Sequence, residues 1–189
     1  LGREWLGLSV GYMTHIDSDT QTVDSAVGDH DGIQQGETAP LSETYCQHTL
    51  AAGNPVRTIE SAEEAGILDS EEYAKFGLSC YLGGTVTVDG EDYGTVCFAD
   101  TESRSRPFTD REETFVDLLA QWVGLTIERR EQASKLRDEH ELTTAILESS
   151  PTGILVLNED GVVTLANDRA SDLLGEGTAL AGEHGLPVT

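Results

Sequence analysis

The sequence predicts an α+β fold in which antiparallel strands are mixed with helices. Two runs rich in strand-forming residues, 79–88 and 93–100, flank Asp89-Gly90, a dipeptide typical of two-residue hairpin turns. A capping box, Thr109-Asp110-Arg111-Glu112, opens a helical pattern that continues to about residue 149. A second hairpin signal follows this helix at residues 158–161.

Before the main hairpin, the sequence predicts two strands and a loop. Apolar residues alternate with small or polar residues over residues 5–16, which indicates a half-buried strand. A turn signal at residues 17–19 leads into a second strand near residues 21–28. Residues 29–40 contain three acidic residues, two glycines and a proline, so they are predicted to form a loop.

Short elements connect this loop to the main hairpin. Ser42 is predicted to cap a helix over residues 43–52. Residues 55–59 are predicted to form a short strand, and residues 61–76 one or two short helices that break at Gly66.

Side chains in the main hairpin alternate between the two faces of the sheet. One face is predicted to carry Cys80, Leu82, Val86 and Val88. The other face is predicted to carry Tyr81, Gly83, Thr85 and Thr87.

The long helix is predicted to start packed on the sheet and to continue as a linker. Its apolar residues recur at helical spacing and then thin out: Phe115, Leu118, Leu119, Trp122, Val123 and Ile127. A loose heptad, interrupted by Arg129 and His140, includes Leu118, Trp122, Leu125, Ala133, Leu136 and Leu147. The heptad favours pairing with a second copy of the helix, and an ordinary solvated helix is the alternative.

The last predicted elements are a hairpin and a short helix. Residues 154–157 and 162–166 are predicted to be strands. Asn167 is predicted to cap a helix over residues 168–174, and Gly175 to stop it.

The chain is strongly acidic, with 35 acidic and 11 basic residues and a formal net charge of -24. Such a surface repels nucleic acid phosphates and anionic lipids, so neither is an expected partner. The acidic residues are spread along the whole chain, which favours a protein from a very salty cytoplasm, where a Debye length of about 3 Å screens repulsion. A generic acidic protein is the alternative.

Several classes of protein are not expected. No apolar run approaches the ~18 residues that a membrane-spanning helix needs, and no secretion signal is visible. The three cysteines are far apart and form no C-x-x-C pair, so a disulfide framework or zinc ribbon is not expected. A reducing cytoplasm fits this cysteine usage.

Four motifs together resemble the GAF domain family. In chain order they are Tyr45-Cys46-Gln47-His48-Thr49, Tyr81-Leu82-Gly83-Gly84, Tyr93-Gly94-Thr95-Val96-Cys97-Phe98-Ala99-Asp100, and Phe108-Thr109 with Glu112 and Leu118-Leu119-Ala120. The resemblance implies an antiparallel sheet with helices on both faces. It assigns residues 1–130 to a GAF sensor domain and residues 131–149 to a helical linker.

Residues 143–175 resemble the opening of a PAS domain, with a strand, turn, strand, asparagine and helix in that order. Residues 150–189 are therefore expected to be the N-terminal part of a PAS domain. Because only two of five PAS strands are expected there, this part is not expected to close a pocket of its own.

The acidic GAF variant resembles haloarchaeal regulators of the bacterio-opsin activator type, and haloarchaeal sensor histidine kinases share the same front end. The resemblance implies a non-enzymatic sensor module in the cytoplasm. It would bind a small ligand or sense thiol redox state, and pass the signal through the helix to an output domain. Transcription regulation is the expected output, with a histidine kinase as the alternative. A ligand-free dimerisation scaffold and a GAF-fold methionine sulfoxide reductase are further alternatives, and a homodimer through the long helix is expected.

The resemblance also implies where a ligand would lie, between the sheet and the helices on one face. The candidate ligand-binding residues are Tyr12, Tyr45, Cys46, Tyr81, Thr85 and Cys97. The alternative for the cysteines is that they pack as small hydrophobic residues.

No catalytic residue or metal ligand is assigned, and the cofactor is left open. No Ser-His-Asp arrangement and no G-x-x-x-x-G-K phosphate loop occurs. Cys46 and His48 do not suggest a metal pair, because residues two apart point about 200° apart around a helix. Cys46 is expected to point inward and His48 toward solvent. The bilin attachment motif of phytochromes is not found.

Overall fold

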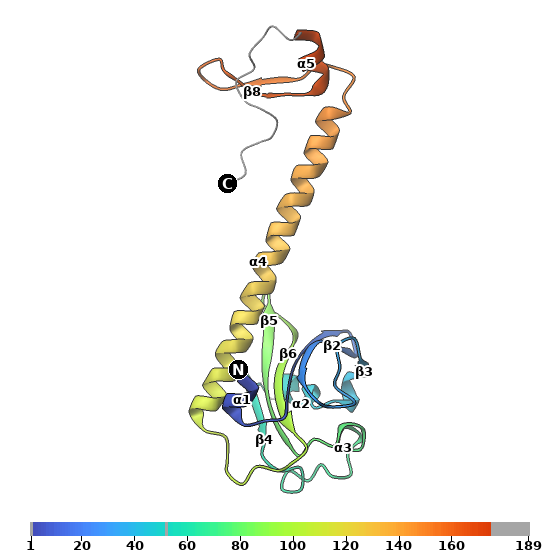
Figure 1. The fold of residues 1–189 in the computed structure, drawn as a ribbon, viewed down its shortest axis with the longest axis vertical. Helices are drawn as coiled ribbons and strands as arrows, with labels where there is room; N and C mark the ends of the chain where they lie inside the picture. The colour runs from blue at the N-terminus through green and yellow to red at the C-terminus, as the bar shows by residue number, and fades with distance from the viewer. Residues whose placement is uncertain (1, 52, 175–189) are drawn as a thin grey trace. The chain divides into compact units, whose positions relative to one another are not determined.

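A computed structural model describes residues 2–51 and 53–174 of the chain (Figure 1). The helices are α1 (Gly2–Leu6), the 3-10 helix η1 (Leu41–Glu43), α2 (Cys46–Ala51), α3 (Glu71–Phe76), α4 (Asp110–Glu148) and α5 (Asp168–Leu174). The strands are β1 (Val10–Asp17), β2 (Thr20–Gly28), β3 (Thr38–Pro40), β4 (Val56–Ile59), β5 (Cys80–Val88), β6 (Glu91–Asp100), β7 (Leu155–Leu157) and β8 (Val163–Ala166). The chain divides into two compact units, residues 1–130 and 131–189.

The first unit is built on a six-stranded antiparallel sheet. Its strand order is β3-β2-β1-β6-β5-β4. The predicted main hairpin is confirmed as β5 and β6, and its turn residues Asp89 and Gly90 both have positive φ, at 51° and 83°. Positive φ at both positions is the geometry that an Asp-Gly turn accepts at low cost. The α+β prediction is confirmed.

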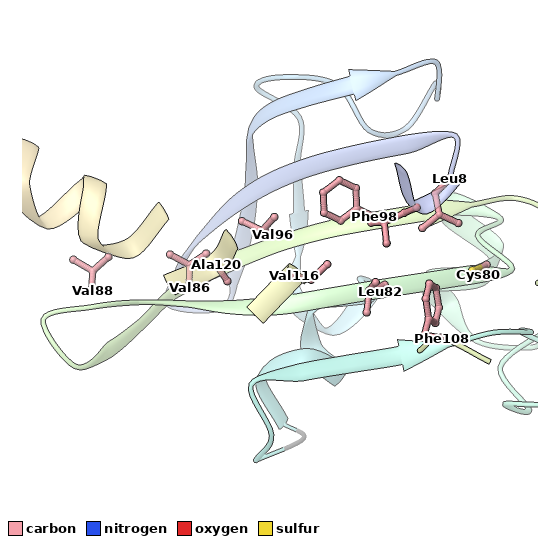
Figure 2. Close-up of a cluster of buried hydrophobic side chains, with 11 residues drawn as sticks. Leu8, Cys80, Leu82, Val86, Val88, Val96, Phe98, Phe108, Val116 and Ala120 are labelled. Atoms are coloured by element: carbon pink, nitrogen blue, oxygen red, sulfur yellow. The ribbon is translucent and has the colours of Figure 1, made fainter. Parts of the chain in front are cut away.

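Helices cover both faces of this sheet, as predicted. On one face, α1 and α4 pack against the side chains that β5 and β6 point toward them (Figure 2). This apolar cluster contains Leu6, Leu8, Cys80, Leu82, Val86, Val88, Val96, Phe98, Phe108, Val116 and Ala120. On the other face, α2 and neighbouring loops cover a second cluster: Val10, Tyr12, Val23, Ile33, Tyr45, Cys46, Ile59, Leu78, Tyr81, Cys97 and Ala99. The predicted alternation of Tyr81 against Cys80 and Leu82 is therefore correct.

The capping box at the start of α4 is confirmed. The backbone N–H of Thr109 donates to Glu112 Oε2 at 2.8 Å, and the N–H of Glu112 donates to Thr109 Oγ1 at 3.4 Å. Further along, α4 lies so close to β5 that a Cβ atom on Gly124 would be 2.2 Å from the carbonyl oxygen of Thr87. This helix runs without a break to Glu148, close to the predicted end.

Four predictions before the main hairpin were wrong in detail. Residues 5–9 are not part of the first strand, because Gly2–Leu6 forms α1, whose Leu6 is buried against the face that α4 covers. The predicted loop 29–40 ends in the edge strand β3, where Pro40 is tolerated because an edge strand has unpaired backbone groups.

The helix predicted over residues 43–52 is shorter than expected and is not capped by Ser42. The preceding turn is instead η1, which follows Pro40 without a side-chain cap. Similarly, residues 61–70 form turns rather than a helix, and α3 begins only after Ser70, whose side chain accepts from the Tyr73 N–H.

The second unit contains the end of α4, the β7–β8 hairpin and α5. The predicted cap is confirmed, because Asn167 Oδ1 accepts from the N–H of Ala170 at 3.0 Å. The fully buried Asn167 amide also donates to the carbonyl oxygens of Leu147 and Thr152, at 2.8 and 3.0 Å. The predicted stop at Gly175 lies outside the described residues. Within those residues, no helix is long and apolar enough to cross a membrane.

Candidate functional site

A cavity of about 120 Å³ lies on the α2 face of the sheet. Strands β1, β2 and β3 supply one side of it, and the turn between η1 and α2, the helix α3 and the segment before β3 supply the other. Its lining residues are Tyr12, Gln21, Val23, Gly32, Ile33, Glu37, Thr38, Ala39, Thr44, Tyr45, Lys75 and Phe76.

The walls of the cavity are mostly aromatic and aliphatic side chains that the fold holds in place. Tyr45 is fixed because its hydroxyl donates to the carbonyl oxygen of Leu78 at 2.6 Å. His30 fixes the segment before β3 to α3, since its Nε2 donates to the carbonyl oxygen of Phe76 at 2.8 Å and its Nδ1 accepts from the Gly32 N–H at 3.2 Å. The polar atoms of these two side chains are therefore already satisfied within the protein.

Gln21 is the exception. The strand alternation of β2 turns Gln21 and Val23 toward the cavity, and Gln21 is only 4% exposed. Among the described residues, Gln21 Oε1 is the buried side-chain oxygen or nitrogen that has no hydrogen-bond partner. Such an orphaned acceptor costs about 1–3 kcal/mol, so its presence calls for a physical explanation.

The charged groups of the lining lie at its solvent side. Lys75 Nζ is 2.6 Å from Glu43 Oε2, and both side chains are about one third exposed. Glu37 is exposed. The lining thus offers one cation, and that cation is already paired with a carboxylate.

A sealed cluster of thiols and hydroxyls lies beside the cavity. Cys46 Sγ on α2 is 3.9 Å from Cys97 Sγ on β6. The hydroxyl of Thr95 lies between them, donating to Cys46 Sγ at 3.0 Å and accepting from the Cys97 thiol at 3.1 Å. Thr14 hydrogen-bonds to Thr95 at 2.8 Å.

Tyr81 closes the other side of this cluster. Its hydroxyl is 2.7 Å from Thr49 Oγ1 and 3.1 Å from Cys97 Sγ. The ring folds over Gly83, where a Cβ atom would lie 2.2 Å from the Tyr81 hydroxyl oxygen. Gly83 is thus the residue that allows Tyr81 to reach Thr49 and Cys97.

These hydrogen bonds distinguish the three thiols chemically. Burial raises the pKa of the Cys46 thiol, but the hydrogen bonds from Cys97, Thr95 and Thr14 outweigh it and leave the pKa below its usual value. Burial and the neighbouring Cys46 raise the pKa of Cys97 well above its usual value. Burial raises the pKa of Cys80, on the opposite face, to about 12. Cys46 is therefore the thiol that ionises first.

The structure places the six candidate residues in two groups and leaves one apart. Tyr12 and Tyr45 line the cavity. Cys46, Tyr81 and Cys97 belong to the thiol and hydroxyl cluster. Thr85 neither lines the cavity nor makes a side-chain hydrogen bond in the cluster, although it pairs with Thr95 across β5 and β6.

Cys46 and His48 have different surroundings, as helix geometry predicts. Cys46 is 1% exposed and faces Cys97. The His48 ring is one third exposed, and its Nε2 is 2.9 Å from Glu72 Oε1 on α3. The described residues hold no group of three or more His, Cys, Asp or Glu side chains that would suit a metal ion.

Sequence reasoning missed most of the cavity and half of the cluster. The missed residues are Gln21, Val23, Gly32, Ile33, Glu37, Thr38, Ala39, Thr44, Lys75 and Phe76 in the lining, and Thr14, Thr49 and Thr95 in the cluster. The sequence did contain one signal for the cavity. Gln21 and Val23 are two positions apart in β2, so their side chains point to the same face of the sheet, which places a glutamine at a core position.

Family comparisons match two parts of the chain. The model of the GAF domain matches residues 3–127, and a model of the PAS domain matches residues 141–187. None of the curated proteins searched matches the chain.

Solved structures with a similar fold are also GAF domains. The PixJ GAF domain of Thermosynechococcus elongatus, in its blue-light-absorbing form, is 15% identical, with a TM-score of 0.59 over 73% of this chain and 84% of that one. A phycoerythrobilin-bound GAF domain of a cyanobacterial phytochrome is 13% identical, with a TM-score of 0.57 over 70% and 82%. The GAF domain of an Acinetobacter phosphoenolpyruvate-protein phosphotransferase is 13% identical, with a TM-score of 0.54 over 70% and 78%. At this identity the likeness concerns the fold.

Proposed function

Since the chain belongs to the GAF domain family and carries a PAS-like segment, it is a sensory signal-transduction module, and we propose that its input is a small molecule bound in the cavity on the α2 face. The single observation that carries this proposal is the orphaned acceptor Gln21 Oε1 in the cavity lining. A bound molecule that donates to this oxygen removes the cost of leaving it unpaired. Tyr12 and Tyr45 are the candidate residues that we propose contact the molecule directly.

The route from the cavity to α4 runs through the sheet. Along β1 and β6, alternate side chains reach opposite faces, so Tyr12 and Cys97 face the cavity side while Val96 and Phe98 face α4. A ligand that shifts β1 relative to β6 therefore changes the surface on which Val116 and Ala120 pack. We propose a population shift between two packings of α4, driven by the different ligand affinities of the two states.

A second copy of the chain is the proposed partner of α4. Leu118, Trp122 and Leu125 occur at heptad spacing and are 58%, 63% and 52% exposed. Trp5, on the neighbouring α1, is also 57% exposed. A symmetric dimer through this surface would remove these side chains from water and give the helix a partner against which to shift.

The proposed output is transcription regulation in the full-length protein, with a histidine kinase as the alternative. The resemblance to haloarchaeal regulators supports the first and also the proposal that the protein works in high salt. Two assays distinguish these outputs. A histidine kinase transfers phosphate from ATP to its own histidine, whereas a transcription regulator binds a fragment of operator DNA. For salt adaptation we expect a chain of net charge -24 to melt tens of degrees lower in dilute buffer than in molar KCl.

Thiol oxidation is a second candidate input, favoured by the 3.9 Å between Cys46 Sγ and Cys97 Sγ. The Cys46 thiolate would attack a peroxide, giving a sulfenic acid and one water. The Cys97 thiol would then attack that sulfur, forming the disulfide and releasing a second water. The two sulfurs lose two electrons and the peroxide gains them.

A bilin is not part of the proposal, although two of the similar structures are bilin-bound GAF domains. A cavity of about 120 Å³ has room for one small ring and not for a four-ring chromophore.

The ligand proposal is tested by thermal shift with three panels of small molecules: neutral aromatics, carboxylates and phosphates. We expect at least one panel to raise the melting temperature of residues 1–189 and to slow hydrogen exchange in α4. Ala39→Leu, which fills the cavity, should abolish the shift, whereas Ala74→Leu on the exposed side of α3 should retain it. If no panel stabilises the wild-type chain, the proposal is wrong.

A further inference from the structure

The size of the cavity limits its occupant to a small molecule. An engineered apolar cavity of ~150 Å³ in another protein binds one benzene molecule. At about 120 Å³, with one side open to solvent, this cavity suits a ligand of one ring.

The walls select for an aromatic body. The rings of Tyr12, Tyr45 and Phe76 and the aliphatic side chains of Val23 and Ile33 surround the cavity. Aromatic rings in such surroundings gain from edge and offset-stacked contacts in addition to the area that they bury.

The polar wall selects for a hydrogen-bond donor. Gln21 Oε1 accepts hydrogen bonds and cannot donate them, and it lacks a protein partner among the described residues. A ligand whose only polar group is an acceptor would leave this oxygen unpaired, so the group that reaches it must be an O–H or N–H.

The charges around the cavity select against anions. Lys75 is committed to Glu43 at 2.6 Å, and no arginine lines the cavity. Glu37 adds a negative charge to the lining, and the chain as a whole carries -24. A carboxylate or phosphate would therefore be desolvated without a counter-charge.

Together these observations point to one class of ligand. We propose that the cavity binds an uncharged aromatic molecule of one ring that donates an O–H or N–H hydrogen bond to Gln21 Oε1, as phenol would. This inference rests on the proposed function, because it names the ligand class of the same cavity.

The test compares three probes of one size on residues 1–189 by calorimetric titration: phenol, benzene and benzoate. Phenol should bind about tenfold more tightly than benzene, since only phenol satisfies the buried oxygen, and benzoate should not bind measurably. In Gln21→Met, which keeps the side-chain length and removes the acceptor, phenol should lose about tenfold in affinity while benzene keeps or gains affinity. Gln121→Met, an exposed glutamine on α4, should leave all three unchanged.

Equal binding of phenol and benzene to the wild-type chain would overturn the inference, as would benzoate binding as tightly as phenol. If Gln21→Met does not fold, the ratio of phenol to benzene on the wild-type chain decides. Where phenol fails and a molecule from the carboxylate or phosphate panel stabilises the chain, the ligand class is wrong and the proposed function stands. Where no panel stabilises the chain, both the ligand class and the proposed function are wrong.

Discussion

Cys46 Sγ and Cys97 Sγ lie 3.9 Å apart in the core of the first unit, with the Thr95 hydroxyl hydrogen-bonded to both. The two cysteines come from a helix and a strand that are 51 positions apart in the chain. Sulfur atoms at this separation need to approach by about 2 Å to form a disulfide of ordinary length.

We expect peroxide to join these two cysteines and to leave Cys80 reduced. Cys46 has the lowered pKa of the three thiols, while Cys80 lies on the other face with its pKa raised to about 12. Mass spectrometry of the unreduced digest should show one cross-linked peptide pair, lighter by two hydrogen atoms than the two free peptides. Cys80→Ala should leave this product intact, and Cys97→Ala should remove it. A cross-link that involves Cys80 in the wild-type chain would show that the proposed pair is wrong.

Replacing Thr95 by valine should destabilise the first unit by about 1–2 kcal/mol. The substitution keeps the shape of the side chain but leaves the buried Thr14 hydroxyl and both thiols without their common partner.

Thr85→Val is the matched control for Thr95→Val. Thr85 pairs with Thr95 on the same hairpin but makes no side-chain bond in the cluster, so its replacement should change the free energy of unfolding by less than about 0.5 kcal/mol. Chemical denaturation of both variants measures the difference. Equal losses of unfolding free energy in the two variants would mean that the hydroxyl network contributes nothing specific to stability.

Glu112 should make the first unit sensitive to acid. Burial raises the pKa of this carboxyl, but hydrogen bonds from Arg106, Thr109 and Arg104 outweigh it and lower the pKa to about 2. Because the folded-state pKa is below that of the unfolded chain, the stabilisation is complete above pH ~4.5 and is lost as the pH falls toward 2. We expect the ionised carboxylate to contribute about 2–3 kcal/mol to the free energy of unfolding. This is less than the full pKa difference would give, because Arg106 is more than half exposed.

Glu112→Gln should lower the free energy of unfolding by this amount at pH 7 and flatten its dependence on pH below about 4.5. Glu113→Gln, one residue along the same helical turn, is the control and should leave the acid dependence unchanged. Denaturant unfolding between pH 2 and 7 measures both. An unaltered pH profile in Glu112→Gln would contradict the assignment of the acid transition to this carboxyl.

The parts of the fold that local chemistry decides could be predicted from the sequence. Asp89-Gly90 specifies a hairpin turn by itself, Thr109 and Glu112 specify a helix start, and Asn167 specifies a cap. Each of these signals involves residues within three or four positions of one another. The assignment of Cys80 and Tyr81 to opposite faces follows from the same short-range rule.

The cavity could not be predicted in the same way, because its residues meet only through long-range packing. Ile33 lies in a segment of acidic residues and glycines with no periodicity. It lines the cavity because His30 fixes that segment to Phe76. The cluster was missed for a related reason. Thr14 and Thr95 are unremarkable as strand residues, and only the register of β1 against β6, which pairs them directly, brings their hydroxyls together.

The exposed face of α4 gives the last prediction. Leu118, Trp122 and Leu125 lie on one side of the helix, whereas Val116, Ala120 and Gly124 lie on the side that packs against the sheet. Trp122→Glu should therefore weaken self-association without affecting the fold, because it places a charge on the proposed dimer surface and not in the core. Light scattering after gel filtration should show a dimer for the wild-type chain and a monomer for Trp122→Glu, with unchanged melting of the monomer. Gln121→Glu adds the same charge one position away, beside the apolar row and not in it, and should weaken association much less. A wild-type chain that stays monomeric at concentrations of ~100 μM, well above a micromolar dissociation constant, would rule out the symmetric helix pairing.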